Sequence, residues 1–80
     1  MSTLDNVKVI LGRKASIYKK RDLDISLGEI ARELGCTSSN VLSALKQLEY
    51  RKEIKRLIPL GMTGDEYTLT IMEKSSILND

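Results

Sequence analysis

The stretch from Leu27 to Leu48, LGEIARELGCTSSNVLSALKQL, decides the fold of this chain. It predicts two helices joined by a turn of three or four residues. Helices that cross steeply need a small residue at the crossing, and Ala31 supplies it. The tight turn needs a backbone with positive φ, which Gly35 allows. Around the turn, the apolar residues that are expected to face the first helix of the pair are Leu34, Cys36, Val41, Leu45 and Leu48.

Capping residues predict where these helices begin and end. Ser26 is a favourable N-cap for the first of them, and Glu29 would complete a capping box. That helix is expected over residues 27–34. The next one is expected to begin after Thr37 or Ser38 and to end at Tyr50 or Arg51.

A further helix is expected upstream, beginning near residue 3 with Ser2 or Thr3 as its N-cap. Gly12 lies inside it and weakens it by about 1 kcal/mol relative to Ala; a close contact at this point is one reason for a glycine. The polar segment 19–24, KKRDLD, predicts a loop, followed by a short edge strand over residues 24–26. The apolar face of the helix is Leu4, Val7, Ile10, Leu11, Ala15 and Tyr18.

Beyond residue 52 the apolar residues change from helical to alternating spacing. Residues 54–60 and 67–71 predict a β-hairpin, joined by the turn formers at 61–66. Pro59 is tolerable only on an edge strand or near a strand end. Residues 73–80 fit either a short helix or a frayed tail. The sequence therefore predicts one α+β domain over residues 1–80, mainly α, with three helices and a two- to three-stranded antiparallel sheet.

The composition is that of an ordinary globular domain, with 41% hydrophobic and 30% charged residues. Three Tyr without Phe or Trp leave an aliphatic core and argue against stacking platforms for single-stranded nucleic acid. A lone cysteine, Cys36, and the absence of His exclude an internal disulfide and the common metal sites and general bases. We therefore expect a protein without catalytic residues, metal or cofactor. No apolar run approaches the roughly 18 residues of a membrane span, so a cytoplasmic protein is expected.

The order of elements resembles the winged helix-turn-helix superfamily over residues 4–72. The residues that carry this resemblance are IARELGCTSSNVLSALKQLE at 30–49, Ile54-Lys55-Arg56 and Tyr67-Thr68-Leu69-Thr70. In size and layout the chain is similar to small stand-alone winged-helix regulators of bacteria, archaea, plasmids and phages. The resemblance implies a helix-turn-helix at 27–50, a hairpin "wing" at 54–72 and double-stranded DNA as the partner.

One departure from the superfamily concerns the end of the third helix. Many members have a glycine in a segment leucine-glutamate-x-x-glycine, whereas here Leu48-Glu49-Tyr50-Arg51 is followed by Lys52. Either Lys52 or a neighbour takes a positive φ at a cost of about 1 kcal/mol, or the helix ends differently and the hairpin begins at another angle.

The outer face of the third helix is the expected reading surface. On a helical wheel Val41, Ala44, Leu45 and Leu48 face inward, and a polar set faces outward. Such a helix fits the major groove, where its side chains reach base edges. Asn40 and Gln47 can each pair with adenine, and Lys46 with guanine or phosphate. The alternative is that these side chains only keep an exposed helix soluble. The expected base-reading residues are Ser39, Asn40, Ser43, Lys46 and Gln47.

Two basic clusters flank this helix in the sequence. With a net charge of only +2, attraction to DNA must come from such local clusters. The alternative is a solvated charge run, and the cluster at 19–21 would also complement the C-terminal dipole of the first helix. The expected phosphate-contacting residues are Thr37, Ser38, Arg51, Lys52, Lys55, Arg56, Lys20 and Arg21.

The hairpin tip argues against a strong grip on DNA by one copy. Wings that enter the minor groove usually carry Arg or Lys, whereas this tip offers Asp65 and Glu66. A weak grip predicts a homodimer. Its candidate surfaces are the first helix and the tail, through the apolar residues Val9, Ile17, Ile77 and Leu78. The alternative is that these four residues complete the core.

Two classes of function follow. The first is a sequence-specific binder of double-stranded DNA that regulates transcription; a close variant is a plasmid or phage partition adaptor with a protein partner at the acidic tip or the C-terminal tail. The second is a winged-helix module for protein interaction, which would show no salt-dependent affinity for duplex DNA.

Overall fold

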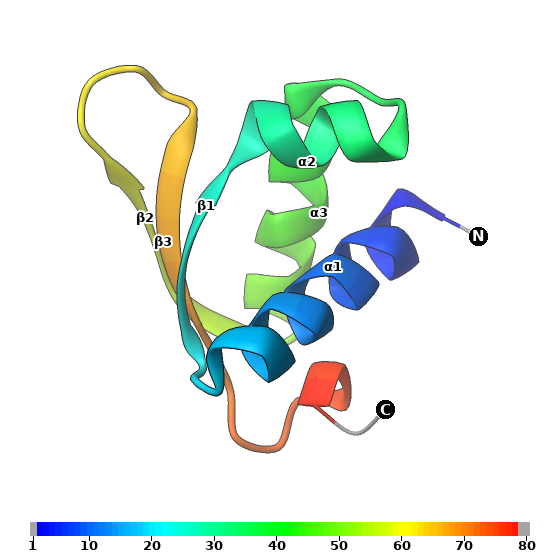
Figure 1. Ribbon diagram of the computed structural model, residues 1–80, viewed down its shortest axis with the longest axis vertical. Helices are drawn as coiled ribbons and strands as arrows, with labels where there is room; N and C mark the ends of the chain where they lie inside the picture. The colour runs from blue at the N-terminus through cyan, green and yellow to red at the C-terminus, as the bar shows by residue number, and fades with distance from the viewer. Residues whose placement is uncertain (1, 79–80) are drawn as a thin grey trace.

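Three helices pack on one face of a three-stranded antiparallel sheet (Figure 1). The computed structural model describes residues 2–78. Within this part of the chain the fold is α+β with three helices, as the sequence predicts. The strand order is β1-β3-β2, so β1 and β2 are the edges. In chain order the elements are α1 (Thr3–Tyr18), β1 (Asp22–Ser26), α2 (Leu27–Leu34), α3 (Ser38–Tyr50), β2 (Ile54–Leu60), β3 (Glu66–Ile71) and a 3₁₀ turn η1 (Ser76–Leu78).

Helix α1 begins with the Ser2 cap, whose hydroxyl accepts from the Asp5 N–H at 3.2 Å. It ends at Lys19, which adopts the left-handed conformation (φ 53°) and donates its N–H to the Ala15 carbonyl. Val7, Ile10, Leu11 and Ala15 are buried as expected, whereas Tyr18 is 62% exposed. Including Tyr18 in the apolar face was therefore wrong, because α1 ends at this residue and its side chain extends past the core.

The turn between α2 and α3 has the conformation that the sequence predicts. Gly35 has φ 68° and donates its N–H to the carbonyls of the last turn of α2. Thr37, rather than Ser38, caps α3 and accepts from the Asn40 N–H at 3.1 Å. Ser26 caps α2 through the Glu29 N–H, while the Glu29 carboxylate lies 3.7 Å from the Lys14 ammonium instead of returning to Ser26. One half of the expected capping box is therefore formed.

Strand β1 begins at Asp22, so the loop predicted for residues 19–24 is wrong at its last three residues. Asp22 and Asp24 are poor strand formers, but they face Thr70 and Thr68 across the ladder. The Thr70 hydroxyl donates to the Asp22 carboxylate at 2.6 Å. Partners in β3 therefore impose the strand on this segment.

In the turn after α3 a non-glycine residue takes a positive φ, which is the first of the two predicted alternatives. Lys52 has φ 61°, and the Lys52 and Glu53 N–H groups donate to the Glu49 and Leu48 carbonyls at 3.0 and 2.9 Å. A non-glycine residue pays roughly 1 kcal/mol for this conformation. Arg56 (φ 57°) lies at an irregularity between Lys55 and Ile58 that the sequence did not indicate.

The C-terminal segment completes the core beneath α1. Ile77 is buried, and a Cβ at Gly12 would lie 3.0 Å from the Ile77 carbonyl oxygen. The close contact expected at Gly12 is therefore confirmed, and its partner is the tail. Of the two alternatives for residues 73–80, a short 3₁₀ turn is present at Ser76–Leu78, while Asn79 and Asp80 lie outside the described residues. Between residues 2 and 78, no helix combines the length and apolar character needed to cross a bilayer.

Candidate nucleic-acid interface

The expected base-reading side chains share one exposed face of α3. Val41, Ala44, Leu45 and Leu48 are buried against the rest of the core. The opposite face is open to solvent and polar, and the wheel therefore predicts the orientation of this helix correctly. The exposed residues on it are Ser39, Asn40, Ser43, Lys46, Gln47 and the aromatic Tyr50.

This face of α3 carries no carboxylate. The one acidic residue of the helix is Glu49, and its carboxylate accepts a hydrogen bond from the Leu57 N–H of β2 at 3.2 Å. Glu49 is exposed, and this hydrogen bond joins α3 to the hairpin. A polyanion that approaches the outer face meets hydroxyls, amides, the Lys46 ammonium and the Tyr50 ring.

The first turn of α1 borders the same face, which the sequence did not indicate. A shallow hollow of about 410 Å³ lies between them, lined by Ser2, Thr3, Leu4, Asn40, Ser43, Ala44 and Gln47. Ser2 can be recognised in the sequence as a helix cap, but its nearness to α3 depends on how the two helices pack. The first turn also carries Asp5, whose charge opposes a phosphate there. We therefore assign Ser2 and Thr3 to the rim of the face.

The basic cluster after α3 lies between the C-terminal end of α3 and the start of β2. Arg51, Lys52, Lys55 and Arg56 are all exposed. Among residues 2–78, ion pairs with carboxylates engage Lys8, Arg13 and Lys14 and none of these four. The side chains next to the C-terminal end of α3 are therefore available to an external anion. Thr37 and Ser38 at the other end of α3 are both exposed, and the Thr37 hydroxyl accepts a hydrogen bond from the Asn40 N–H.

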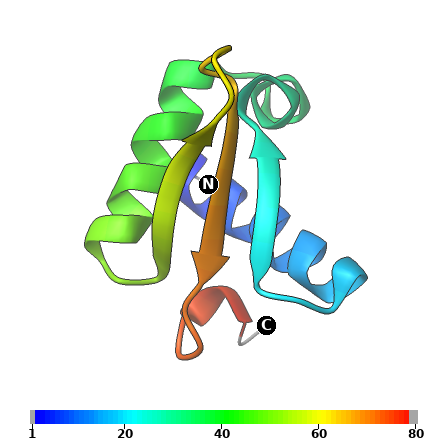
Figure 2. The same ribbon diagram turned by 90° about the vertical axis from the view of Figure 1, so that its left-hand side faces the viewer.

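The structure does not bring the second basic cluster to this face. Lys20 and Arg21 lie in the turn between α1 and β1. Figure 2 shows α3 along one side of the molecule and the C-terminal end of α1 on the other, with the sheet in front. A duplex lying along α3 is therefore out of reach of Lys20 and Arg21.

The hairpin turn differs from the acidic tip that the sequence predicts. The Asp65 carboxylate accepts from the Ser26 hydroxyl at 2.5 Å and from the Gly28 N–H at 2.8 Å, and the Asp65 carbonyl accepts from the Leu27 N–H at 2.8 Å. The hydrogen bond from Ser26, followed by that from Gly28, holds the pKa of Asp65 below its usual range. The negative charge of Asp65 thus lies at the N-terminus of α2, where the helix dipole favours it.

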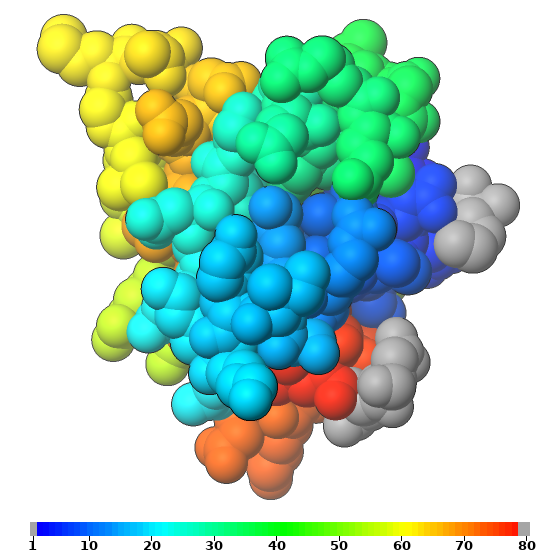
Figure 3. Space-filling view, in the orientation of Figure 1, coloured from blue at the N-terminus to red at the C-terminus, as the bar shows by residue number. Residues whose placement is uncertain are grey.

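What remains at the tip is small and uncharged. Residues 61–64 are exposed, and the Met62 side chain extends entirely into solvent. In Figure 3 this yellow turn projects beyond the rest of the surface. Glu66 stays exposed but pairs with Ser26 and Leu60 inside the sheet. The tip therefore presents an apolar side chain and backbone groups to a partner.

Of the four apolar residues expected either in a dimer surface or in the core, two belong to the core and two are exposed. Ile77 is buried and Leu78 packs against the core, whereas Val9 and Ile17 are 51% and 66% exposed. Cys36 is partly buried against the core, which fits a packing role in the turn.

Residues 2–78 contain no group of three or more acidic or Cys residues placed to hold a metal ion. Comparisons with protein-family models, with curated proteins and with solved structures give no match to this chain. Its function is therefore inferred from the geometry of its own residues.

Proposed function

We propose that this chain is a winged helix-turn-helix protein that binds double-stranded DNA in a sequence-specific manner and regulates transcription by occupying its site. The observation that carries the proposal is the outer face of α3, which is exposed, polar and free of carboxylates. A helix of 13 residues is about 20 Å long. B-DNA has a major groove about 12 Å wide, which admits such a helix.

The side chains on this face divide into two kinds of contact. Asn40 and Gln47 carry amides that pair with adenine through one donor and one acceptor, and Lys46 donates to guanine. Ser39 and Ser43 are short and suit base edges or phosphates close to the helix. Each well-placed bidentate pair contributes about 1–3 kcal/mol of discrimination against the wrong base.

The basic residues after α3 supply the sequence-independent part of the affinity. Arg51, Lys52, Lys55 and Arg56 would contact phosphates on the backbone beside the groove and release the counterions bound there. Their position next to the end of α3 supports this role. Because the Asp65 carboxylate accepts hydrogen bonds from the start of α2, the exposed carboxylate that remains at this end of the hairpin is that of Glu66.

A homodimer would double these contacts. The surface of α1 that faces α2 is the candidate interface, because Ile17 and Tyr18 are exposed there next to Ile30 and the Arg13–Glu33 ion pair. Sedimentation equilibrium with and without DNA measures the oligomeric state, and Ile17→Asp is expected to leave the protein monomeric.

The decisive experiment selects binding sites from a random duplex pool and then measures affinity for the selected and a scrambled duplex between about 50 and 200 mM salt. We expect a preferred sequence and a logarithm of affinity that falls linearly with the logarithm of salt concentration. Asn40→Ala and Gln47→Ala should each relax the preference at one position, by about tenfold or more.

Arg56→Gln is the matched control. It should weaken binding to both duplexes alike and reduce the salt slope by about one unit. If the selected pool shows no preferred sequence, α3 does not read DNA. If no duplex binds at low salt, the protein is not a DNA-binding protein at all, and the protein-interaction alternative takes its place.

A further inference from the structure

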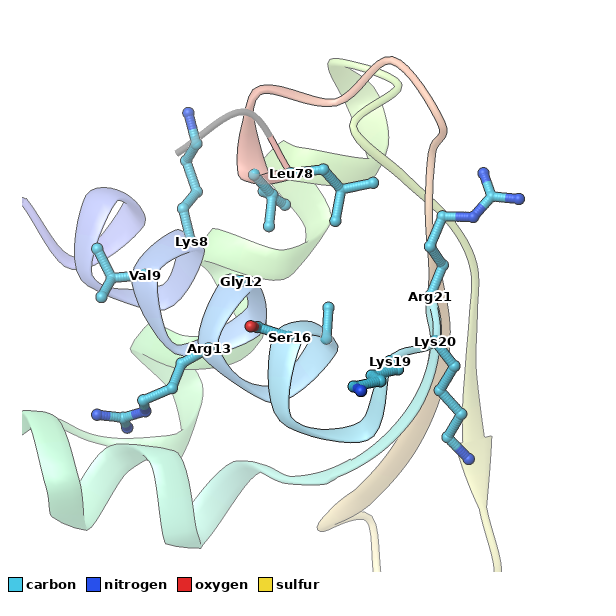
Figure 4. A pocket seen from close by; sticks show the side chains of 11 residues that line it. Lys8, Val9, Gly12, Arg13, Ser16, Lys19, Lys20, Arg21 and Leu78 are labelled. Carbon is cyan, nitrogen blue, oxygen red and sulfur yellow. The ribbon is translucent and has the colours of Figure 1, made fainter.

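A second surface lies between α1 and the C-terminal segment. Figure 4 shows this hollow, which has a volume of about 640 Å³. One wall is the exposed side of α1 with Val9, Gly12 and Ser16, and the other is formed by Ile77 and Leu78. None of the residues proposed to read DNA lines it.

The charged residues of this hollow are all positive. Lys8, Arg13, Lys19, Lys20 and Arg21 line it, and no Asp or Glu between residues 2 and 78 does. Lys8 lies 3.8 Å from Glu53 and Arg13 lies 2.6 Å from Glu33. Within the part of the chain that the structure describes, Lys19, Lys20 and Arg21 form no ion pair. Figure 4 shows the cationic side chains around the hollow and extending outward, so its middle stays open.

Part of the lining of the hollow is apolar. Val9 on α1 is half exposed, and Leu78 on the C-terminal segment is partly buried. Gly12 lets the Ile77 backbone approach α1 closely, because a Cβ there would lie 3.0 Å from the Ile77 carbonyl oxygen. The lining therefore combines aliphatic side chains and small residues, which we call the floor, with ammonium and guanidinium groups.

These features distinguish between three occupants. A DNA backbone supplies phosphates but no aliphatic group to fill the floor, and a duplex is too wide to enter a hollow of this size. A second copy of the chain would bring the same five cations against themselves. An acidic peptide with an aliphatic side chain satisfies both parts, because its carboxylates pair with the rim and its apolar side chain removes the floor from water.

We propose that this hollow binds an acidic segment of a partner protein that carries a large aliphatic side chain. The C-terminal end of α1, which leads to Lys20 and Arg21, lies on the other side of the molecule from α3 (Figure 2), so a duplex on α3 and a peptide at this end of the hollow would be bound together. The chain would then link a DNA site to a partner. The peptide interaction goes beyond the proposed DNA binding and is measured without DNA.

The test uses a short fluorescent peptide of Asp and Glu with central Leu residues, and fluorescence anisotropy at low and physiological salt. A second peptide has Ser in place of Leu, and a third has Lys in place of the acids. We expect the first to bind most tightly and the third not at all. Lys20→Glu with Arg21→Glu should weaken binding about tenfold or more, and Val9→Asp should remove the preference for Leu over Ser.

Lys52→Glu with Lys55→Glu is the matched control, because it makes the same charge change beside α3. At physiological salt, which screens the effect of the reduced overall charge, this variant should keep its peptide affinity within about twofold of the wild type. Three results would overturn the proposal. These are equal weakening by both charge reversals, loss of duplex affinity instead of peptide affinity in Lys20→Glu with Arg21→Glu, and dissociation of a dimer by that variant. The last two would assign the hollow to DNA or to a second copy.

Discussion

Two carboxylates attach distant segments to the helical layer, and they do so in different surroundings. Glu53, in the turn after α3, accepts hydrogen bonds from Ser75 and Ser76 of the C-terminal segment. Asp65, at the end of the hairpin turn, accepts from Ser26 and Gly28 at the start of α2. The Glu53 side chain is only 15% exposed and lies beside Lys8. Asp65 is less deeply buried and forms no ion pair with any residue from 2 to 78.

The pKa values of the two carboxylates are lowered for different reasons. Burial acts to raise the pKa of Glu53, but the Ser76 hydroxyl, the charge of Lys8 and the Ser76 and Ser75 groups outweigh it, so its pKa lies below the ordinary 4.5. For Asp65 the hydrogen bond from Ser26 is the main cause of a lowered pKa. Glu53 thus stabilises the attachment of the C-terminal segment beneath α1. Asp65 chiefly determines where the hairpin turn lies beside α2.

The largest effect is expected where the C-terminal segment enters the core. Ile77→Ala removes a buried side chain and should lower the free energy of unfolding by about 2–4 kcal/mol, measured by urea denaturation. Ile58→Ala deletes the same atoms from a half-exposed position and should change it by less than about 0.5 kcal/mol. Equal losses in the two variants would show that the C-terminal segment does not pack as described.

Glu53→Gln is expected to cause the next largest loss in the free energy of unfolding. It removes a charged acceptor of three hydrogen bonds and leaves Lys8 without its partner, which should cost about 1–2 kcal/mol at neutral pH. Glu73→Gln makes the same change at an exposed position and should be nearly neutral. If both variants have the stability of the wild type, Glu53 does not attach the tail.

The same pair of proteins tests the acidity of Glu53. Because its pKa in the folded state lies below its pKa in the unfolded chain, its contribution is complete above pH 4.5 and is lost as the pH falls through the folded value. The stability difference between the wild type and Glu53→Gln should therefore shrink as the pH falls below about 4.5. A difference that stays constant down to pH 3 would contradict the lowered pKa.

Neither attachment was predictable from the sequence, and the reason is distance along the chain. Glu53 bonds to residues 22 and 23 positions away, and Asp65 to residues 37 and 39 positions away. By contrast, the bounds of α2 follow from its neighbours Ser26 and Gly35, and they were predicted to the residue.

The same contrast applies to the candidate site. A helical wheel is enough to predict which side of α3 faces solvent, because Val41, Leu45 and Leu48 are local. The hollow needs α1, Lys20 and Leu78 to meet, and the separation of Lys20 from α3 depends on how the helices pack. No local pattern carries that information, so the sequence could not show that Lys20 and Arg21 lie apart from α3.

A smaller effect of opposite sign is expected beside Glu53. Lys52→Gly relieves the left-handed backbone (φ 61°) of the turn that carries this carboxylate and should stabilise the protein by about 1 kcal/mol in urea denaturation. Lys55→Gly loses the same charge from an extended strand and should destabilise it. If Lys52→Gly is the less stable of the two, the turn does not strain the residue at 52.

The smallest change in stability is expected for Asp65→Asn, because solvent screens this position more than that of Glu53. The amide still accepts from the Gly28 N–H but no longer accepts from the Ser26 hydroxyl, which also caps α2 through the Glu29 N–H. Hydrogen exchange at Gly28 and Glu29 should therefore accelerate, while Glu66→Gln should leave both amides unchanged. An Asp65→Asn protein that loses more stability than Glu53→Gln would reverse the comparison, since the hairpin attachment would then contribute more to the fold than the buried tail.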